Sequence, residues 1–396
     1  MVMKASTIAL HFGPEGRELG DPVSPSPVVS TSFFNKPGTI GFSANDLAKN
    51  APHFYTRWSN PTLEILEAKL AALDQGEAAV SFASGMAAIS ALFLDRLKSG
   101  DHLILSDVCY AGVAELVHDY LPHHGIEVSA VDTSQPSTVK NALRPNTKLI
   151  HVETPANPIL RITDVKAIAE IAHSAGVELS VDSTIATPLG MKPITLGADF
   201  VVHSLTKYIC GHGDALGGAI VARSGDADRL RRGSLIHLGG SLSPFSAWLI
   251  LRGLETLVPR MNMHQANARM VEEYLASHPK VRSVLWPGSQ RHPQHQLAAS
   301  QMTNFSSLMS FTMKHDSEEA AVRVADKLKV VSYAVSLGKT RSLLYYIPTE
   351  NIIQSAFRLQ GPAAEAYRDA AGDGVFRLSV GLEDADDIIA DLEQAL

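Results

Sequence analysis

A lysine and an aspartate each follow a strand-like segment of the sequence, and together they could perform imine chemistry. Residues 198–202 form a strand-like run that leads to Lys207, and the apolar residues 177–181 lead to Asp182. A lysine amine forms a Schiff base with an aldehyde, and a carboxylate can hold a pyridine nitrogen protonated, so that the ring accepts the electrons of a carbanion. The pair therefore predicts a pyridoxal phosphate (PLP) site and an enzyme of amino-acid metabolism.

Hydroxyl groups and an expected helix start could hold the phosphate of this cofactor. The S-x-T-K sequence contains Ser204 and Thr206, and Gly85 and Met86 open a helical stretch directly after the strand-like residues 78–82. A helix N-terminus offers free N–H groups and the positive end of a dipole to an anion. Taken singly, each hydroxyl is more often a capping or turn group, so only their combination favours phosphate binding.

An aromatic residue follows a further strand-like segment. Tyr110 comes directly after HLILSDVC, where its ring could stack on a flat cofactor ring. A half-buried tyrosine that packs against the protein is an equally good interpretation of this residue alone.

Alternating apolar runs and helical stretches must position these residues. We expect strands at 78–82, 102–105, 128–131, 149–153, 177–182 and 198–203, and helices at 61–75, 85–94, 113–121 and 165–175. Such alternation implies an α/β fold with a mostly parallel sheet and helices on both faces. Sheets of this kind bind ligands beyond the carboxyl ends of their strands, where Lys207 and Asp182 are expected.

The organisation of the chain indicates three parts. Residues 1–60 are rich in proline, glycine and serine and are expected to form an extended arm that contacts a neighbouring subunit. Residues 61–255 would form the PLP-binding domain, and residues 256–396 a smaller α/β C-terminal domain, with strands near 307–312 and 376–380.

Composition excludes several classes of protein. The 396 residues carry 34 basic and 41 acidic side chains, a net charge of −7, and no basic runs, so neither nucleic acid nor an anionic membrane is an expected partner. The chain has only two cysteines, no signal-peptide core and no apolar stretch of the ~20 residues that span a membrane, which predicts a cytoplasmic protein. His292 and His295 lack a third ligand at close spacing, so no metal is expected.

Several ordered motifs give a more specific reading. Their sequences and positions are YTRWSNPT (55–62), FASGMAA (82–88), ETPANP (153–158), VDST (181–184), SLTKYICGHGD (204–214), AVSLG (334–338) and RLSVGLED (377–384). Through these motifs the chain resembles the Cys/Met-metabolism PLP enzymes of fold type I (aspartate-aminotransferase-like). The resemblance covers nearly the whole chain. That family includes the cystathionine and methionine γ-lyases, cystathionine γ-synthase and the homoserine-ester sulfhydrylases.

The resemblance implies a role for each matching residue of the cofactor site. Lys207 would be the Schiff-base lysine and proton shuttle, Asp182 would pair with the pyridinium nitrogen, and Asn157 would contact the 3-oxygen of the cofactor. Tyr110 would stack on the ring and assist proton transfer. The implied phosphate ligands are Gly85, Met86, Ser204 and Thr206, with Tyr55 and Arg57 of a neighbouring subunit.

The resemblance also implies a substrate site and an assembly. Ser336 and Arg377 would hold the substrate, with the arginine forking onto its α-carboxylate. Because Tyr55 and Arg57 would act in trans, each site would need two chains, and the family implies a homotetramer built from two such dimers.

The chain departs from its family at positions that bear on the substrate. Gly112 stands where methionine γ-lyases carry a cysteine, and Lys339 and Arg341 occupy the segment in which cystathionine-handling enzymes often carry a glutamate. The two cations indicate either a distal acidic group on the substrate or a solvated loop. Tyr345 and Tyr346 replace the usual histidine-proline segment and could shape an atypical pocket.

We therefore expect a PLP-dependent carbon–sulfur lyase that acts on a sulfur amino acid, of the methionine or cystathionine type, by γ-elimination. One alternative is γ-replacement, as in cystathionine γ-synthase or an O-acyl-homoserine sulfhydrylase. An alternative of a different class is a non-catalytic binding protein on the same scaffold.

Overall fold

The computed structural model describes residues 1–396 except 1–2, 15–18, 20–21, 37–42, 44–52 and 316–317. Its larger sheet has seven strands, which lie side by side in this order: β1 (Ala78–Phe82), β7 (Gly218–Ala222), β6 (Phe200–Ser204), β5 (Glu178–Asp182), β4 (Thr147–Glu153), β2 (His102–Ser106) and β3 (Glu127–Val131). Neighbours from β6 to β3 pair in parallel, and β7 is antiparallel to both β6 and β1. The structure confirms the α/β class with a mostly parallel sheet.

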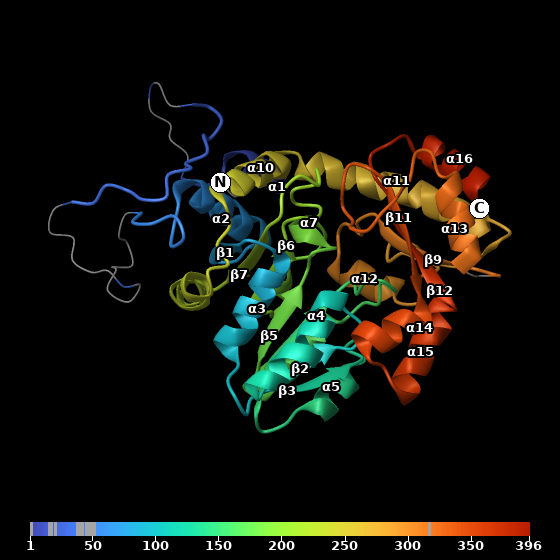
Figure 1. The fold of residues 1–396 in the computed structure, drawn as a ribbon, viewed down its shortest axis with the longest axis horizontal. Helices are drawn as coiled ribbons and strands as arrows, with labels where there is room; N and C mark the ends of the chain where they lie inside the picture. Colours follow the sequence, from blue (N-terminus) through green and yellow to red (C-terminus); the bar gives the residue numbers. More distant parts are fainter. Residues whose placement is uncertain (1–2, 15–18, 20–21, 37–42, 44–52, 316–317) are drawn as a thin grey trace.

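Helices cover both faces of this sheet (Figure 1). The helices of this part of the chain are α1 (Ala5–His11), α2 (Pro61–Asp74), α3 (Gly85–Arg96), α4 (Ala111–Glu115), α5 (Pro136–Ala142), α6 (Val165–Ser174), α7 (Thr187–Gly190), α8 (Ser224–Leu230), α9 (Ile236–Leu238) and α10 (Pro244–Glu255). Alternate strand residues pack against α3 and α4 on one face, and against α2 or α6 on the other. Because both faces are buried, the central strands read as continuous apolar runs.

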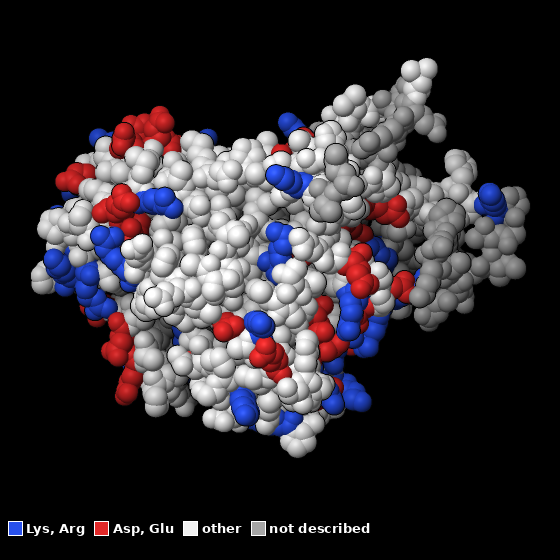
Figure 2. All heavy atoms as spheres, turned by 180° about the vertical axis from the view of Figure 1, so that it is seen from behind, with Lys and Arg blue, Asp and Glu red and all other residues white. Residues whose placement is uncertain are grey.

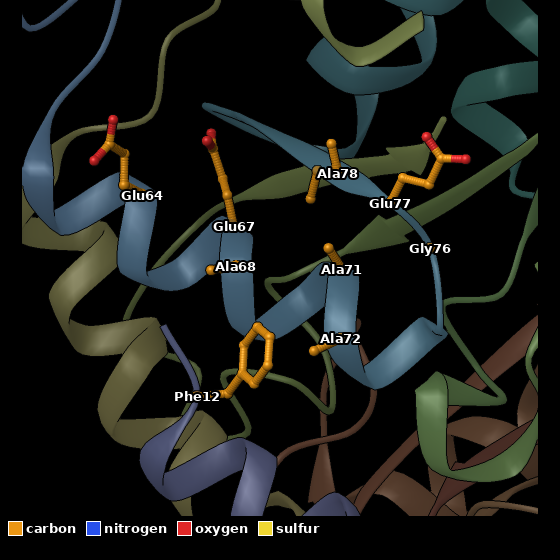
Figure 3. A pocket seen from close by; sticks show the side chains of 10 residues that line it. Phe12, Glu64, Glu67, Ala68, Ala71, Ala72, Gly76, Glu77 and Ala78 are labelled. Carbon is orange, nitrogen blue, oxygen red and sulfur yellow. The ribbon is translucent and has the colours of Figure 1, made fainter. Parts of the chain in front are cut away.

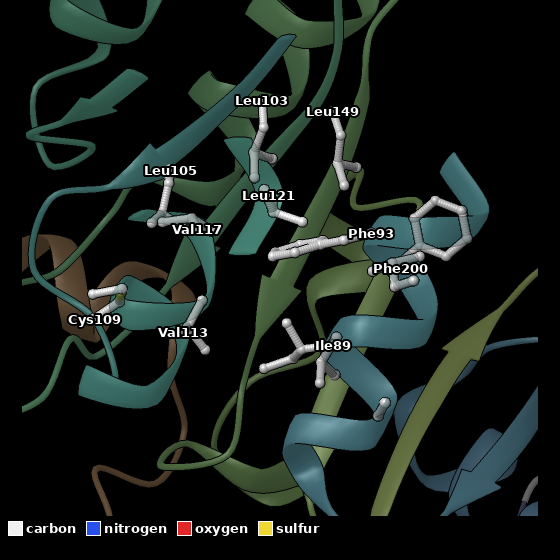
Figure 4. Packing of buried hydrophobic residues seen from close by; sticks show 14 of the residues in the cluster. Ile89, Phe93, Leu103, Leu105, Cys109, Val113, Val117, Leu121, Leu149 and Phe200 are labelled. Carbon is white, nitrogen blue, oxygen red and sulfur yellow. The ribbon is translucent and has the colours of Figure 1, made fainter. Parts of the chain in front are cut away.

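The packing beneath α3 shows how one face is filled. Phe93 and Ile89 of α3 lie against Leu149 of β4 and Phe200 of β6, while Val113 of α4 belongs to the same buried cluster (Figure 4). Burial of large apolar side chains is the main stabilising contribution to such a layer. The cluster fixes α3, and therefore its N-terminus, against the sheet.

Local sequence signals set where the helices begin. Asn60 caps α2, because its side chain accepts from the N–H of Thr62 at 2.9 Å, and Pro61 occupies the first turn. Ser84 caps α3 in the same way through the N–H of Ala87 at 3.0 Å. The start of α3 therefore lies directly after β1, as the sequence predicts.

The C-terminal part contains a second sheet. Its strands lie in the order β10 (Ser332–Tyr333), β11 (Leu343–Pro348), β12 (Gly374–Ser379), β9 (Leu308–Met313) and β8 (Val281–Leu285). Its helices are α11 (Leu257–Ser277), α12 (His295–Gln301), α13 (Glu318–Lys327), α14 (Thr349–Ile352), α15 (Gly361–Ala371) and α16 (Ala385–Ala395). Phe311 and Phe376 stack at 5.1 Å in its core, and α11 runs toward this sheet from the side of α10 (Figure 1).

Several elements differ from the expectation. Ala5–His11 form helix α1, which packs on α2, although an extended arm was expected there. The helix expected at 113–121 is broken into α4, a π-helical turn Leu116–Tyr120 and a 3₁₀ turn Leu121–His124, as proline at position 122 cannot continue an α-helical hydrogen-bond ladder. The three-part division of the chain stays a prediction.

The surface carries charges of both signs. On the face shown in Figure 2, basic and acidic side chains are interspersed around a broad uncharged area. Among the described residues, no helix has the length and apolar character needed to span a bilayer.

Candidate active site

The predicted chemical residues meet at the carboxyl edge of the larger sheet. Asp182 ends β5, Lys207 follows the end of β6, and Glu153 ends β4. Glu153 and Asp182 are paired neighbours in the β4–β5 register, and Asp182 pairs with Val202 of β6. Parallel strands thus bring together carboxylates and an amine from three segments that are far apart in the sequence.

Lys207 is a half-buried amine whose pKa is lowered. Its Nζ donates a hydrogen bond to Oγ of Ser336 at 3.1 Å. Burial, together with the positive charges of Arg377 and Lys339 and against the opposing effect of Asp182, lowers the pKa of Lys207 to about 8. A lysine with this pKa is partly neutral near pH 7, as a nucleophile or general base requires.

Arg260 on α11 fixes the backbone that follows Lys207. Its guanidinium donates to the carbonyl oxygens of Tyr208 at 2.7 Å, Ile209 at 3.1 Å and Gly253 at 2.7 Å. The residue is 5% exposed, and truncating a buried charged donor leaves its partners unsatisfied. No sequence pattern singles out Arg260, because an arginine in a helical stretch is usually a solvated charge.

Asp182 is a buried carboxylate that pairs with no cation among the described side chains. Its Oδ1 accepts a hydrogen bond from the backbone N–H of Thr184 at 2.9 Å, and the residue is 7% exposed. Burial raises the pKa of Asp182, since a charge without a counter-ion is costly inside a protein. A pyridinium nitrogen would supply the missing positive charge and N–H donor, so this carboxylate fits PLP.

The start of α3 and the turn after β6 form a small backbone cradle. A Cβ at Gly85 would lie 2.9 Å from Cβ of Ser204, so only glycine fits this close approach. Ser204 therefore lies against the helix N-terminus, where an anion is favoured. The hydroxyl of Thr206 bonds to the backbone of Gly217, donating to its carbonyl at 3.2 Å and accepting its N–H at 3.1 Å. Phosphate contact by these residues remains a prediction that this arrangement fits.

Tyr110 presents an exposed ring beside the cradle. The residue is 48% exposed at the start of α4. A Cβ at Gly112 would lie 2.8 Å from Cε1 of Tyr110 and 3.5 Å from Sδ of Met86, so the tyrosine ring, Gly112 and Met86 lie close together. The ring is free to stack on a flat cofactor, and a cysteine at position 112 would force it to move.

Glu153 holds two of the predicted site residues by their backbones. Its Oε2 accepts the N–H of Tyr110 at 2.6 Å and its Oε1 accepts the N–H of Asn157 at 2.8 Å. Burial, reinforced by the neighbouring Asp182, raises the pKa of Glu153 to about 8. This glutamate belongs to the ETPANP motif, but the motif alone does not indicate a role for it. Its position at a strand end, like that of Asp182, was the available signal.

Ser336 and Arg377 join the C-terminal part to this edge. Arg377 donates to the carbonyl of Ser336 at 3.2 Å and to Oδ1 of Asn157 at 3.3 Å. Burial lowers the pKa of Arg377, and within the described chain it forms no ion pair with a carboxylate. Together with Lys207, which bonds to the Ser336 hydroxyl, it offers a place for an incoming carboxylate.

Tyr55 and Arg57 lie apart from the other predicted residues. Arg57 donates through Nη1 to the carbonyl of Ile236, and its guanidinium lies 5.6 Å from the ring centroid of Tyr55. Among the described residues, no hydrogen bond or ion pair joins either side chain to Lys207 or Asp182. Their predicted contact with phosphate therefore stays a proposal about an assembly.

Other features of the molecule lie outside this region. A pocket of about 310 Å³ is lined by Phe12, Glu64, Glu67, Ala68, Ala71, Ala72 and residues 76–79 (Figure 3). It contains none of the predicted site residues. Within the described ranges, no three His, Cys, Asp or Glu side chains are grouped to hold a metal.

Comparisons with known proteins agree with this geometry. The family model described as "Cys/Met metabolism PLP-dependent enzyme" matches residues 6–396. The chain is 42% identical over 394 residues to the L-methionine gamma-lyase of Fusobacterium nucleatum subsp. polymorphum, covering 98% of this chain and 97% of that protein. It is 39% identical to the cystathionine gamma-lyase of Bacillus subtilis (strain 168), covering 100% and 99%. The crystal structure of metB from Corynebacterium glutamicum superposes with a TM-score of 0.89 at 39% identity, covering 100% and 98%.

Proposed function

Since the chain belongs to the Cys/Met metabolism PLP-dependent enzyme family, we propose that it is a carbon–sulfur lyase that acts on a sulfur amino acid by γ-elimination. The methionine and cystathionine γ-lyases that it resembles at 42% and 39% identity support this reaction. The observation that carries the proposal is the convergence of a low-pKa lysine, Lys207, with Asp182 at one sheet edge and with the substrate-side pair Ser336 and Arg377.

Different residues would bind different parts of PLP. Asp182 would hold the pyridinium nitrogen, and Gly85, Met86, Ser204 and Thr206 would surround the phosphate. Tyr110 would cover the ring, and Asn157, held by Glu153, would contact the 3-oxygen. When bound, PLP supplies an aldehyde that condenses with amines and a ring that accepts electrons from the substrate carbon.

The other residues position the substrate and move its protons. Arg377 would bind the α-carboxylate in a fork and so orient the Cα–H bond. The neutral amine of Lys207 would take the α-proton and return a proton further along the substrate. Ser336 accepts a hydrogen bond from Nζ of Lys207 at 3.1 Å and would hold the amine in place. Loss of a β-proton would then accompany expulsion of the γ-substituent as a thiol, and water would release the remaining four-carbon unit as 2-oxobutyrate and ammonia.

A substrate panel tests this function. The enzyme would be incubated with methionine, cystathionine and O-acyl homoserines, with and without a thiol, and 2-oxobutyrate, ammonia and thioether measured. We expect 2-oxobutyrate and ammonia from a thioether amino acid without any added thiol. Only traces of 2-oxobutyrate beside rapid thioether formation would instead establish γ-replacement. A protein without the violet absorption band that borohydride abolishes would be a binding protein.

We also propose that the active unit is a dimer and that two dimers form a homotetramer. Leu19, Val23 and Phe34 of the N-terminal segment are almost fully exposed, and apolar surface of this kind is typical of a segment that packs on another subunit. Arg57 lies in the same segment and pairs with no carboxylate among the described residues. It is therefore available to a phosphate in a neighbouring chain. Both cysteines are unpaired, which supports a place in the reducing cytoplasm.

Mixing two inactive variants tests the contribution in trans. Arg57→Ala and Lys207→Ala should each lose activity, and their co-expressed hybrids should recover about one quarter of it, because half of the random dimers contain one intact site. Each variant expressed alone is the control. Hybrids that stay as inactive as their parents would place Arg57 in the site of its own chain.

A further inference from the structure

Lys339 lies along the turn that follows Lys207. A Cβ at Gly213 would lie 2.6 Å from Cε and 3.0 Å from Nζ of Lys339. The next residue, Thr340, donates its N–H to the carbonyl of Gly211 at 2.9 Å. The lysine side chain therefore extends over the glycine turn 211–213, which begins four residues after Lys207.

The same segment carries Ser336, which bonds to both Lys207 and Arg377. Lys207 Nζ donates to the hydroxyl of Ser336 at 3.1 Å, and Arg377 donates to its carbonyl at 3.2 Å. The sequence 336–339 thus runs from the proposed substrate-binding pair to Lys339. The positive charge of Lys339 also contributes to lowering the pKa of Lys207, which places the two ammonium groups within electrostatic range.

Lys339 has no acidic partner to balance its charge. It is half-buried, and in the described part of the chain it makes neither a hydrogen bond nor an ion pair. The neighbouring Asp214 instead accepts from the thiol of Cys210 at 3.3 Å. Three cations, Lys207, Arg377 and Lys339, therefore lie around one region, and an uncompensated half-buried cation is stabilised by an anion that binds there.

We propose that Lys339 binds a carboxylate at the distal end of the substrate's γ-substituent. The substrate class is thus an amino acid with two anionic ends, whose α-carboxylate is bound by Arg377 and whose distal carboxylate is bound by Lys339. This inference rests on the proposed function, and it assigns Lys339, one of the two cations after S-L-G, to substrate recognition. Arg341, two residues further on, is exposed and forms no ion pair within the described ranges, so it serves as a matched control cation.

Two probe substrates that differ in one charge test the assignment. The O-succinyl ester of homoserine ends in a carboxylate. In its distal methyl ester that end is uncharged, while the side chain has nearly the same length. We expect Lys339→Met to lower kcat/KM for the anionic ester about ten-fold, as for a charge-assisted contact that is partly exposed, and to change that of the neutral ester less than about two-fold. Lys339→Arg should keep most of the preference, since it keeps the charge.

The controls separate this inference from the proposed function. Arg341→Met should leave both values unchanged. Equal falls for the two esters after Lys339→Met would show an effect on Lys207 or on folding, and no fall for the anionic ester would show that Lys339 does not bind it. Either result overturns the inference while the γ-elimination stands. A wild-type enzyme that consumes no thioether or ester at all would instead overturn the proposed function.

Discussion

Replacement of Lys207 by alanine is expected to lower turnover by at least about 10³-fold, because one side chain supplies both the covalent anchor of the cofactor and the base that moves the substrate's protons. The fold should survive, since Lys207 makes a single side-chain hydrogen bond, to Ser336, among the described contacts. Release of 2-oxobutyrate from the best thioether substrate measures the loss, and circular dichroism with a thermal melt checks the fold.

The pH dependence of the wild-type enzyme provides a second test of this lysine. Burial and two neighbouring cations lower the pKa of Lys207 to about 8, and the neutral amine is the form that accepts a proton. The turnover rate should therefore rise with pH up to about 8 and level off above it. Lys207→Arg would not restore the rate, because a guanidinium stays protonated throughout this range.

The cofactor itself supplies the control for the Lys207 variant. Lys207→Ala should still bind PLP through the phosphate and ring contacts, but borohydride should then leave no covalent adduct on the chain. In the wild-type protein, a mass spectrum after reduction should place the adduct on residue 207. An adduct on another lysine, or a Lys207→Ala variant with a tenth of normal activity, would contradict the assignment.

Sequence patterns predicted the parallel core of the fold better than its edges. Strands β2, β4, β5 and β6 are buried on both faces and therefore appear as apolar runs of strand length. Strand β7 was not predicted, because its sequence GAIVA follows a glycine-rich turn and it is a strand only through pairing with β1 and β6. The pairing with β1 joins segments over 100 residues apart, which no local sequence pattern reports.

The second sheet was harder to predict for the same reason. From the sequence, Tyr345 and Tyr346 of strand β11 are interpreted as residues that could shape a pocket. The structure pairs Tyr345 with Arg377 across β11 and β12 and buries Tyr346 at 6% exposure against Phe376. Tyr346 is therefore a core residue of this sheet, and its alternative role in the pocket loses support.

In the site, residues with a recognisable motif were predicted, and residues that act through the backbone were missed. Lys207 and Asp182 were found because their side-chain chemistry is distinctive at strand ends. Glu153 and Arg260 hold backbone N–H groups and carbonyls instead. Those partners become known only when the chain has folded. The chemistry of a site can thus be inferred from residue types, whereas the residues that hold its backbone in place are identified only from the folded structure.

Replacement of Arg377 by alanine should weaken substrate binding and leave cofactor binding intact. Removing one partner of a buried, hydrogen-bonded charge pair costs about 2–5 kcal/mol, and Arg377 is half-buried, so the lower end applies. We expect KM for the thioether substrate to rise about 30-fold, with a smaller fall in kcat. Steady-state kinetics on the holoenzyme, with PLP content measured by its absorbance, give both values.

The charge of Arg377 predicts a further change that distinguishes substrate binding from a structural role. Arg377 lowers the pKa of Lys207, so its removal should raise that pKa and move the rising limb of the kcat profile to higher pH. Arg377→Lys keeps the positive charge but not the bidentate contact with the carboxylate. The rising limb of its kcat–pH profile should therefore stay at the wild-type pH, while KM still rises. A normal KM in Arg377→Ala would remove this residue from the substrate site. If KM rises but the rising limb of the kcat–pH profile does not shift, the guanidinium binds substrate without influencing the pKa of Lys207.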